Sequence, residues 1–189
     1  MHASTRRAVL VGAAVMLAGI VLAVVVVRLD GSGSKQPVAP PVAVTNGTTA
    51  AGRTPLPGFG ETHVTVKTAT STLSWCLLLA ATVAQQDRGL MQVTDPTLGG
   101  YDGMLFRFDH DTTVRFYMRN TPMPLSIAWI ASDGHFVSST DMPPCEDRDG
   151  CPTFGAAAPY RVAIEVPQGG LGRLGIGPGA TVVDDNRGC

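Results

Sequence analysis

The chain has 189 residues, of which 44% are hydrophobic and 15% are charged, which is typical of one globular domain plus an additional segment. The formal net charge of −1 excludes the strongly basic surface that nucleic-acid binding usually needs. We therefore expect a single folded domain and no nucleic-acid partner.

The first feature along the chain is an apolar segment, Ala8 to Val27, that contains no charged residue. As a helix it is long enough to span the hydrocarbon core of a bilayer, about 30 Å. Arg6 and Arg7 precede it, so the short N-terminus is expected to stay in the cytoplasm. We predict a cytoplasmic segment 1–7 and an uncleaved signal anchor 8–29 in the cell membrane. A long cleaved signal peptide is the alternative, and it leads to the same extracytoplasmic compartment.

The segment 30–61 is rich in proline, glycine and other small residues and has few charges. Such a composition cannot bury a hydrophobic core. We interpret it as a disordered linker between the anchor and a globular domain over residues 62–189.

Within that domain the hydrophobic period is mostly two, which is typical of β-strands. The predicted strands are 63–67, 73–80, 104–108, 114–118, 126–132, 136–140, 160–166 and 180–183. Asp133-Gly134 predicts a tight hairpin turn in which both residues have positive φ. Thr82 and Gln85 have the spacing of a capping box and Gly89 a stop signal, which predicts one short helix. The expected fold class is mostly β (α+β), a compact barrel-like or sandwich-like domain.

The four cysteines, Cys76, Cys145, Cys151 and Cys189, fit an oxidising compartment, where an even number predicts disulfides. Of the three pairings, Cys145 with Cys151 and Cys76 with Cys189 is favoured because the first pair is already close in sequence. Zinc is the rival hypothesis, but no C-x-x-C pair occurs and no histidine lies near a cysteine.

Several apparent catalytic signals lack their partners. The GLGRLG sequence that begins at Gly170 matches a dinucleotide-binding pattern, but too little chain follows it for the rest of that unit. The scattered histidines form no HExxH motif and no nucleophile-elbow serine is present. The sequence therefore predicts no catalytic constellation, no cofactor and no metal.

A family resemblance rests on a series of short motifs in a fixed order. RGLM at 88–91, GMLFRF at 103–108, FYMRNTPMPLSI at 116–127 and VAIEV at 162–166 resemble the family called domain of unknown function 192. The resemblance covers almost all of residues 64–185 and implies a small, mostly β, often exported domain without an established activity. Tyr117 and Ser126 stand where the family commonly has tryptophan and aspartate, so no acid–base role is expected at Ser126.

The candidate site centres on the loop after residue 118. Tyr117 and Arg119 share one strand face, and this combination suits a carboxylate, phosphate or sugar ligand. Glu165 has the opposite parity from its apolar neighbours and could face the same surface. The candidate binding residues are Arg88, Tyr117, Arg119, Asn120, Thr121, Met123 and Glu165.

A structural role for the same residues is the alternative. Arg119 or Arg88 would then pair with Glu165, and Asn120 and Thr121 would satisfy backbone groups of the turn. In that case we expect Arg119 to be mainly architectural.

Two functional classes follow. The favoured one is a non-catalytic, membrane-anchored module of the cell envelope that binds a small ligand or another envelope protein. The alternative is an envelope enzyme acting on an anionic or carbohydrate substrate through Arg119, Asn120 and Glu165. An enzyme needs a base, nucleophile or metal at a cleft, and the sequence offers one plausible carboxylate.

Overall fold

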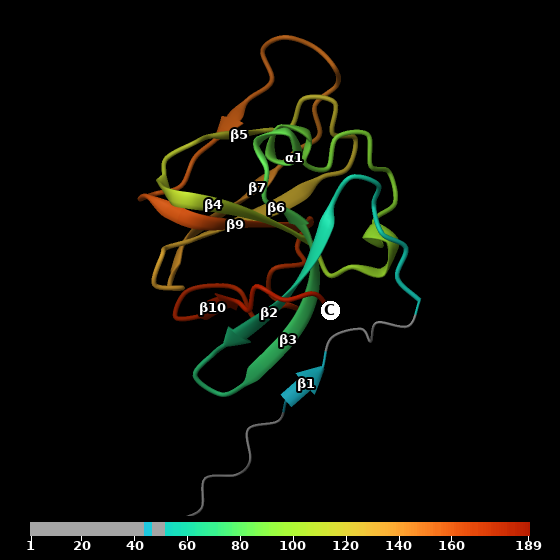
Figure 1. The fold of residues 1–189 in the computed structure, drawn as a ribbon. Helices are drawn as coiled ribbons and strands as arrows, with labels where there is room; N and C mark the ends of the chain where they lie inside the picture. The colour runs from blue at the N-terminus through green and yellow to red at the C-terminus, as the bar shows by residue number, and fades with distance from the viewer. Residues whose placement is uncertain (1–43, 47–51) are drawn as a thin grey trace, which may run out of the picture. The chain divides into compact units, whose positions relative to one another are not determined.

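The fold is a mixed β-sheet with one short helix (Figure 1). The computed structural model describes residues 44–46 and 52–189; the predicted cytoplasmic segment, the anchor and most of the linker lie outside them. In the described part, no helix has the length and hydropathy of a membrane span. The elements are β1 Val44–Asn46, β2 Gly60–Lys67, β3 Thr72–Ala80, α1 Val83–Arg88, the 3₁₀ turn η1 Leu98–Gly100, β4 Met104–Thr112, β5 Phe116–Tyr117, β6 Leu125–Ile130, β7 Phe136–Met142, β8 Thr153–Phe154, β9 Tyr160–Pro167 and β10 Thr181–Asp184.

The strands of the main sheet follow the order β10-β2-β3-β4-β9-β6-β7, and β1 also pairs with β3. The β1–β3 and β3–β4 pairs are parallel, and the remaining pairs are antiparallel. The two ends of this order meet, because His135 bridges Thr181 and Val182 N donates to Gly134 O at 2.8 Å. These contacts join the turn residues before β7 to the start of β10, and the mostly β fold with one short helix is as predicted. A separate ribbon joins β5 to β8.

Both faces of the sheet are covered, so the core has two clusters. One cluster lies on the face that carries Val66, Leu105, Ile164 and Val182. The other lies on the opposite face and is larger and richer in aromatic residues, with Phe106, Phe116, Trp129 and Tyr160. The strands β4, β6 and β9 alternate between the two clusters, because successive side chains of a strand point to opposite faces. The candidate site lies on the aromatic face.

Most predicted elements are confirmed. The helix begins as expected, since Gln85 N donates to Thr82 Oγ1 at 3.3 Å and Thr82 N donates to Gln85 Oε1 at 3.0 Å. The turn prediction is wrong for Asp133: Gly134 has a φ of 85°, but Asp133 is not among the residues with positive φ. The strand predicted over 114–118 shortens to β5, and β8, its partner, was not predicted.

The folded domain starts earlier than the predicted boundary at residue 62. Thr54 N donates to Gly99 O at 2.8 Å, and Leu56 and Phe59 pack against the aromatic cluster. Arg88 Nη1 donates to Pro57 O at 2.7 Å. Residues 52–61 were assigned to the linker from their composition. In the structure they pack and hydrogen-bond onto the domain, because their few apolar side chains contact its core.

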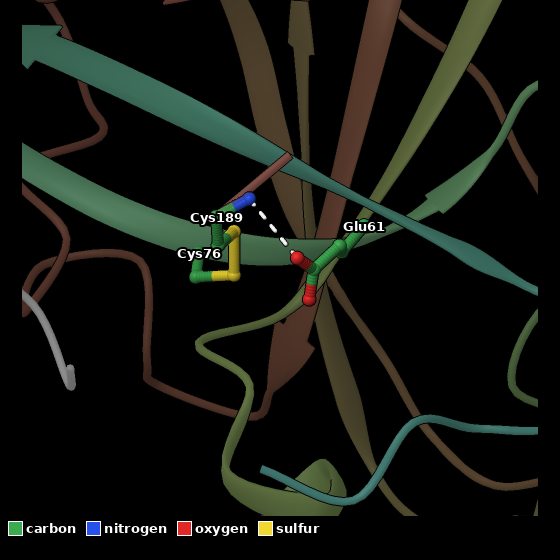
Figure 2. Close-up of side chains that lie close together, drawn as sticks. All are labelled: Glu61, Cys76 and Cys189. Atoms are coloured by element: carbon green, nitrogen blue, oxygen red, sulfur yellow. Dashed lines mark hydrogen bonds between the residues drawn. A yellow bond between two sulfur atoms is a disulfide. The ribbon is translucent and has the colours of Figure 1, made fainter. Parts of the chain in front are cut away.

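The structure contains both favoured disulfides. Cys145 pairs with Cys151 and Cys76 with Cys189, across sequence separations of 6 and 113 residues. Glu61 lies beside the second bridge (Figure 2), and its Oε1 accepts a hydrogen bond from Cys189 N at 3.0 Å. The second disulfide therefore fixes the end of the chain to the centre of β3.

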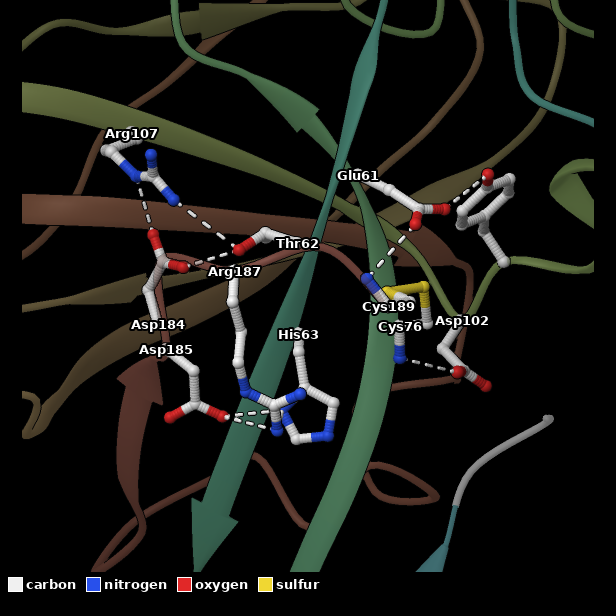
Figure 3. Close-up of a disulfide and its surroundings, with 11 residues drawn as sticks. Glu61, Thr62, His63, Cys76, Asp102, Arg107, Asp184, Asp185, Arg187 and Cys189 are labelled. Atoms are coloured by element: carbon white, nitrogen blue, oxygen red, sulfur yellow. Dashed lines mark hydrogen bonds and ion pairs between the residues drawn. A yellow bond between two sulfur atoms is a disulfide. The ribbon is translucent and has the colours of Figure 1, made fainter. Parts of the chain in front are cut away.

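The last residue of β10 and the residues after it run along β2 and are held by backbone and charged contacts (Figure 3). His63 N donates to Arg187 O at 2.8 Å, and Asp185 N donates to His63 O at 3.0 Å. Arg107 Nε lies 2.6 Å from Asp184 Oδ2 in a partly buried ion pair. We call residues 184–189 the C-terminal strap.

Candidate functional site

A pocket of about 290 Å³ lies between α1, the second half of β4 and the segment through β5. Its apolar walls include Leu90 after the helix, Phe106 and Phe108 of β4, and Phe116 of β5. Glu165 of β9 lines the same pocket. Other polar and charged residues contribute to the lining as well. A concavity with apolar walls and polar groups that can orient a ligand is the usual form of a small-molecule site.

Local contacts hold α1 over this pocket. Gln86 Nε2 donates to Arg107 O at 2.6 Å, which ties the helix to β4. Tyr117 Oη donates to Asp87 O at 2.8 Å, which ties it to β5. Gly89 ends the helix with a φ of 47°, and a Cβ atom there would lie 3.3 Å from the Phe106 ring. The glycine therefore allows the chain to turn tightly against Phe106.

Glu165 is the charged group that the sheet places deepest in the site. Its neighbours across the strands are Met104 of β4 and Ile127 of β6, both fully buried. The Glu165 residue is 4% exposed. Burial raises the pKa of its carboxyl group from 4.5 to about 8, because a carboxylate loses its hydration there.

The structure brings four of the seven candidate residues to this pocket: Arg88, Tyr117, Thr121 and Glu165. The others lie elsewhere. Arg119 is half exposed and lines a shallower neighbouring pocket, to which Tyr117 also contributes. Asn120 has a φ of 56° and its carbonyl accepts a hydrogen bond from Gln92 N, so it serves the turn. Met123 is 7% exposed and packs in the core, which corrects its assignment as a contact residue.

The predicted pairing of Glu165 with an arginine is wrong. Arg119 Nε lies 2.7 Å from Asp147 Oδ1, in the loop closed by the Cys145–Cys151 disulfide. Arg88 donates to Pro57 O and stacks over the Phe59 ring at 4.9 Å. Strand parity indicated which side of its strand each residue faces. It could not indicate the distance between the Arg119 loop and the centre of β9, because that distance depends on the tertiary fold.

We expect Arg119→Ala to lower the free energy of unfolding by less than about 1 kcal/mol, because its ion pair with Asp147 is largely exposed. Arg107→Ala is the matched control. Its ion pair with Asp184 is much less exposed, and breaking it should cost a few kcal/mol. Urea unfolding of both variants measures the difference. A loss for Arg119→Ala as large as that for Arg107→Ala would contradict this assignment.

The sequence-based site missed the aromatic walls. Phe106, Phe108 and Phe116 were assigned to strands, but nothing in their spacing indicated that they leave an unfilled space. His110 and Thr112 line the pocket as well, because β4 continues four residues beyond its predicted end. The one available signal was the aromatic residues of the FRF and FYM segments, which lie on two strands that follow each other in the chain.

Glu61, Cys76 and Cys189 form the one group of metal-ligand residue types that the described part of the chain brings within 4.8 Å of one another. In the structure the two sulfur atoms are bonded to each other. Zinc is bound by cysteine thiolates, and a disulfide contains none. Glu61 instead accepts hydrogen bonds from Cys189 N and from Tyr101 Oη, the latter at 2.9 Å. This cluster is a structural cross-link.

Comparison with known proteins agrees with the motif order. The family model of domain of unknown function 192 (DUF192), described as an uncharacterised ACR, matches residues 64–183. The chain belongs to the DUF192 family. The match begins in β2 and ends in β10, so it spans the main sheet, α1 and Glu165.

Two solved structures share the DUF192 fold. A protein of unknown function from Novosphingobium aromaticivorans is 30% identical, with a TM-score of 0.59 over 69% of this chain and 90% of that one. A protein from Sinorhizobium meliloti that is described as a transcription regulator is 27% identical, with a TM-score of 0.56 over 67% and 95% of the two chains. No curated protein matches the chain.

Proposed function

We propose that this DUF192 protein is a membrane-anchored, extracytoplasmic module that binds a small, largely apolar molecule without transforming it. The observation that carries the proposal is a buried carboxyl group, Glu165, at a pocket whose walls include several aromatic side chains. Such a group is costly to bury, and its position on a central strand makes it a fixed recognition point rather than a mobile surface charge.

The mouth of the pocket supports the same proposal. Four large hydrophobic residues of the described part are exposed, and three of them, Val83, Val114 and Tyr117, line this pocket. Exposed apolar side chains at the mouth of a pocket with aromatic walls are suited to an occupant that is largely apolar.

The anchor and linker supply the location in this proposal, from the charge-free segment Ala8 to Val27 and the arginines before it. The two disulfides are consistent with an oxidising compartment. The regulator description belongs to the Sinorhizobium protein. The net charge of −1 of this chain favours a small ligand over DNA.

The enzyme alternative has weaker support. It required Arg119, Asn120 and Glu165 at one site, but Arg119 and Asn120 are not among the residues that line the pocket of Glu165. Arg119 is held by Asp147 and Asp149. A binding role needs only the pocket and its carboxyl group.

The test is recovery of the full-length chain from the membranes of the cell that makes it, with mass spectrometry of the small molecules that remain bound. We expect the wild-type chain in the membrane fraction with an apolar molecule bound. Val114→Asp, which places a charge at the pocket rim, should lose that molecule. Val183→Asp is the matched control, because Val183 is also exposed but does not line this pocket.

Two results would contradict the proposal. Equal retention by both variants would place the molecule elsewhere, and recovery of a shortened soluble chain would show that the anchor is cleaved. Chemical conversion of the recovered molecule by fresh protein would favour the enzyme.

A further inference from the structure

The Glu165 side chain has an unused hydrogen-bonding capacity. Among the described residues no hydrogen bond or ion pair reaches its carboxyl group, and burial is the sole cause of its raised pKa. A polar group of a buried residue that has no protein partner usually finds one in water or in a ligand. Glu165 lines the cavity, so a bound molecule can supply the partner.

The charged and titratable groups around the pocket are either hydrogen-bonded to other residues or exposed. Arg88 donates to Pro57 O, and Arg115 donates to both the hydroxyl and the carbonyl of Thr153. Tyr117 Oη is hydrogen-bonded to the carbonyl of Asp87. Asp87 and His110 are exposed side chains of the lining. No lining cation is thus paired with Glu165, and the surroundings favour the neutral carboxylic acid.

A protonated carboxyl group presents a donor and an acceptor side by side. Its complement is a ligand group whose acceptor faces the carboxyl O–H and whose donor faces the carboxyl C=O, as in a primary amide or a lactam. Such a pair makes two hydrogen bonds without burying a charge. An ammonium or carboxylate ligand would have to lose its hydration in the same apolar space, at a much larger cost.

The walls indicate the rest of the ligand. Four aromatic side chains line the pocket: Phe106, Phe108, Phe116 and Tyr117. The Phe106 and Phe116 rings meet edge to face at 5.0 Å. An apolar cavity of about 150 Å³ can hold benzene, so the volume of about 290 Å³ has room for a ring with a short substituent.

We propose that the pocket binds a neutral molecule in which an aromatic or similarly flat apolar group carries an amide-type donor–acceptor edge, and that this edge pairs with the Glu165 carboxyl group. The proposal rests on the proposed function, since it names the ligand class of the same pocket.

The test uses four probes of nearly equal size on the full-length chain in lipid nanodiscs, with empty nanodiscs as the blank: 3-phenylpropanamide, its N,N-dimethyl derivative, 3-phenylpropylamine and 3-phenylpropanoate. At pH 6.5 we expect the primary amide to bind about tenfold or more tightly than the other three. The dimethyl amide lacks the donor, and the amine and carboxylate are charged. Calorimetry or NMR titration measures the affinities.

Two substitutions at Glu165 separate a neutral pair from an ion pair. Glu165→Gln keeps a donor and an acceptor, so it should keep the preference for the amide, and above pH 8 it should bind the amide better than wild type does. Glu165→Leu should lose the preference. If the amine instead binds most tightly and Glu165→Gln abolishes its binding, the site recognises a cation and the inference is overturned.

The outcomes also separate this inference from the proposed function. If all four probes bind with similar affinity and Val114→Asp weakens them while Val183→Asp does not, the pocket binds small apolar molecules but Glu165 does not select among them. The proposed pocket itself is refuted if no probe binds to the wild-type chain. It is also refuted if Val114→Asp leaves the affinity for the probes unchanged.

Discussion

We expect Glu165→Gln to be more stable than wild type at pH 9 and equally stable, within about 1 kcal/mol, near pH 4. The pKa of Glu165 is raised from 4.5 to about 8 in the folded chain, so between these values the folded state holds a proton that the unfolded state has lost. The wild-type stability attributable to this group is complete below pH 4.5, falls as the pH rises, and is lost above about pH 8. At about 1.4 kcal/mol per pKa unit, the full difference is on the order of 5 kcal/mol.

Urea unfolding of both proteins at pH 4.5, 7 and 9 measures this difference. Glu146→Gln is the matched control, because it makes the same chemical change at an exposed position. Parallel profiles for wild type and Glu165→Gln would mean that a hydrogen-bond donor or a cation stabilises the Glu165 carboxylate in the folded chain.

The second large effect concerns the disulfide between Cys76 and Cys189. Removing both cysteines as Cys76→Ala/Cys189→Ala should destabilise the chain by about 5 kcal/mol, because the bridge closes a loop across a separation of 113 residues. For a domain of this size the corresponding fall in Tm is roughly 15 °C. Cys145→Ala/Cys151→Ala, across a separation of 6 residues, should cost about 2.4 kcal/mol.

Unfolding curves of the two double variants give the comparison directly. The remaining contacts of the C-terminal strap, including the pair of Arg107 with Asp184, stay in place in both variants. Equal losses for the two, or a larger loss for the short loop, would show that closure of the long loop contributes little to stability.

Much of the fold could be predicted because it depends on local signals. The capping box at Thr82 and Gln85, the alternation in β2 and β9 and the proximity of Cys145 to Cys151 are all visible in short stretches of sequence. The ribbon of β5 with β8 was missed because each strand has two residues, which is too short for a periodic pattern. The folded residues 52–61 were missed because proline and glycine dominate their composition.

The site was predicted less completely because a pocket is a property of distances between elements. Parity placed Glu165 on the correct face, but it could not show that Arg119 lies over the loop of Asp147 instead. The walls from α1 and β4 are distant in sequence from Glu165, so no local pattern joins them. The sequence therefore identified Glu165 as a candidate residue without identifying the pocket that it lines.

The exposure of α1 has a kinetic consequence for any ligand. None of its six residues is buried, whereas β9 is paired on both sides within the sheet. Segments with few buried contacts open at low free energy, while central strands exchange their amide hydrogens mainly through global unfolding. The helix α1 can thus open and close many times during one lifetime of the folded state, while β9, which carries Glu165, stays paired in the sheet. For the ligand proposed above, we expect entry and escape to follow the opening of this one short helix, so that the residence time does not depend on the lifetime of the fold.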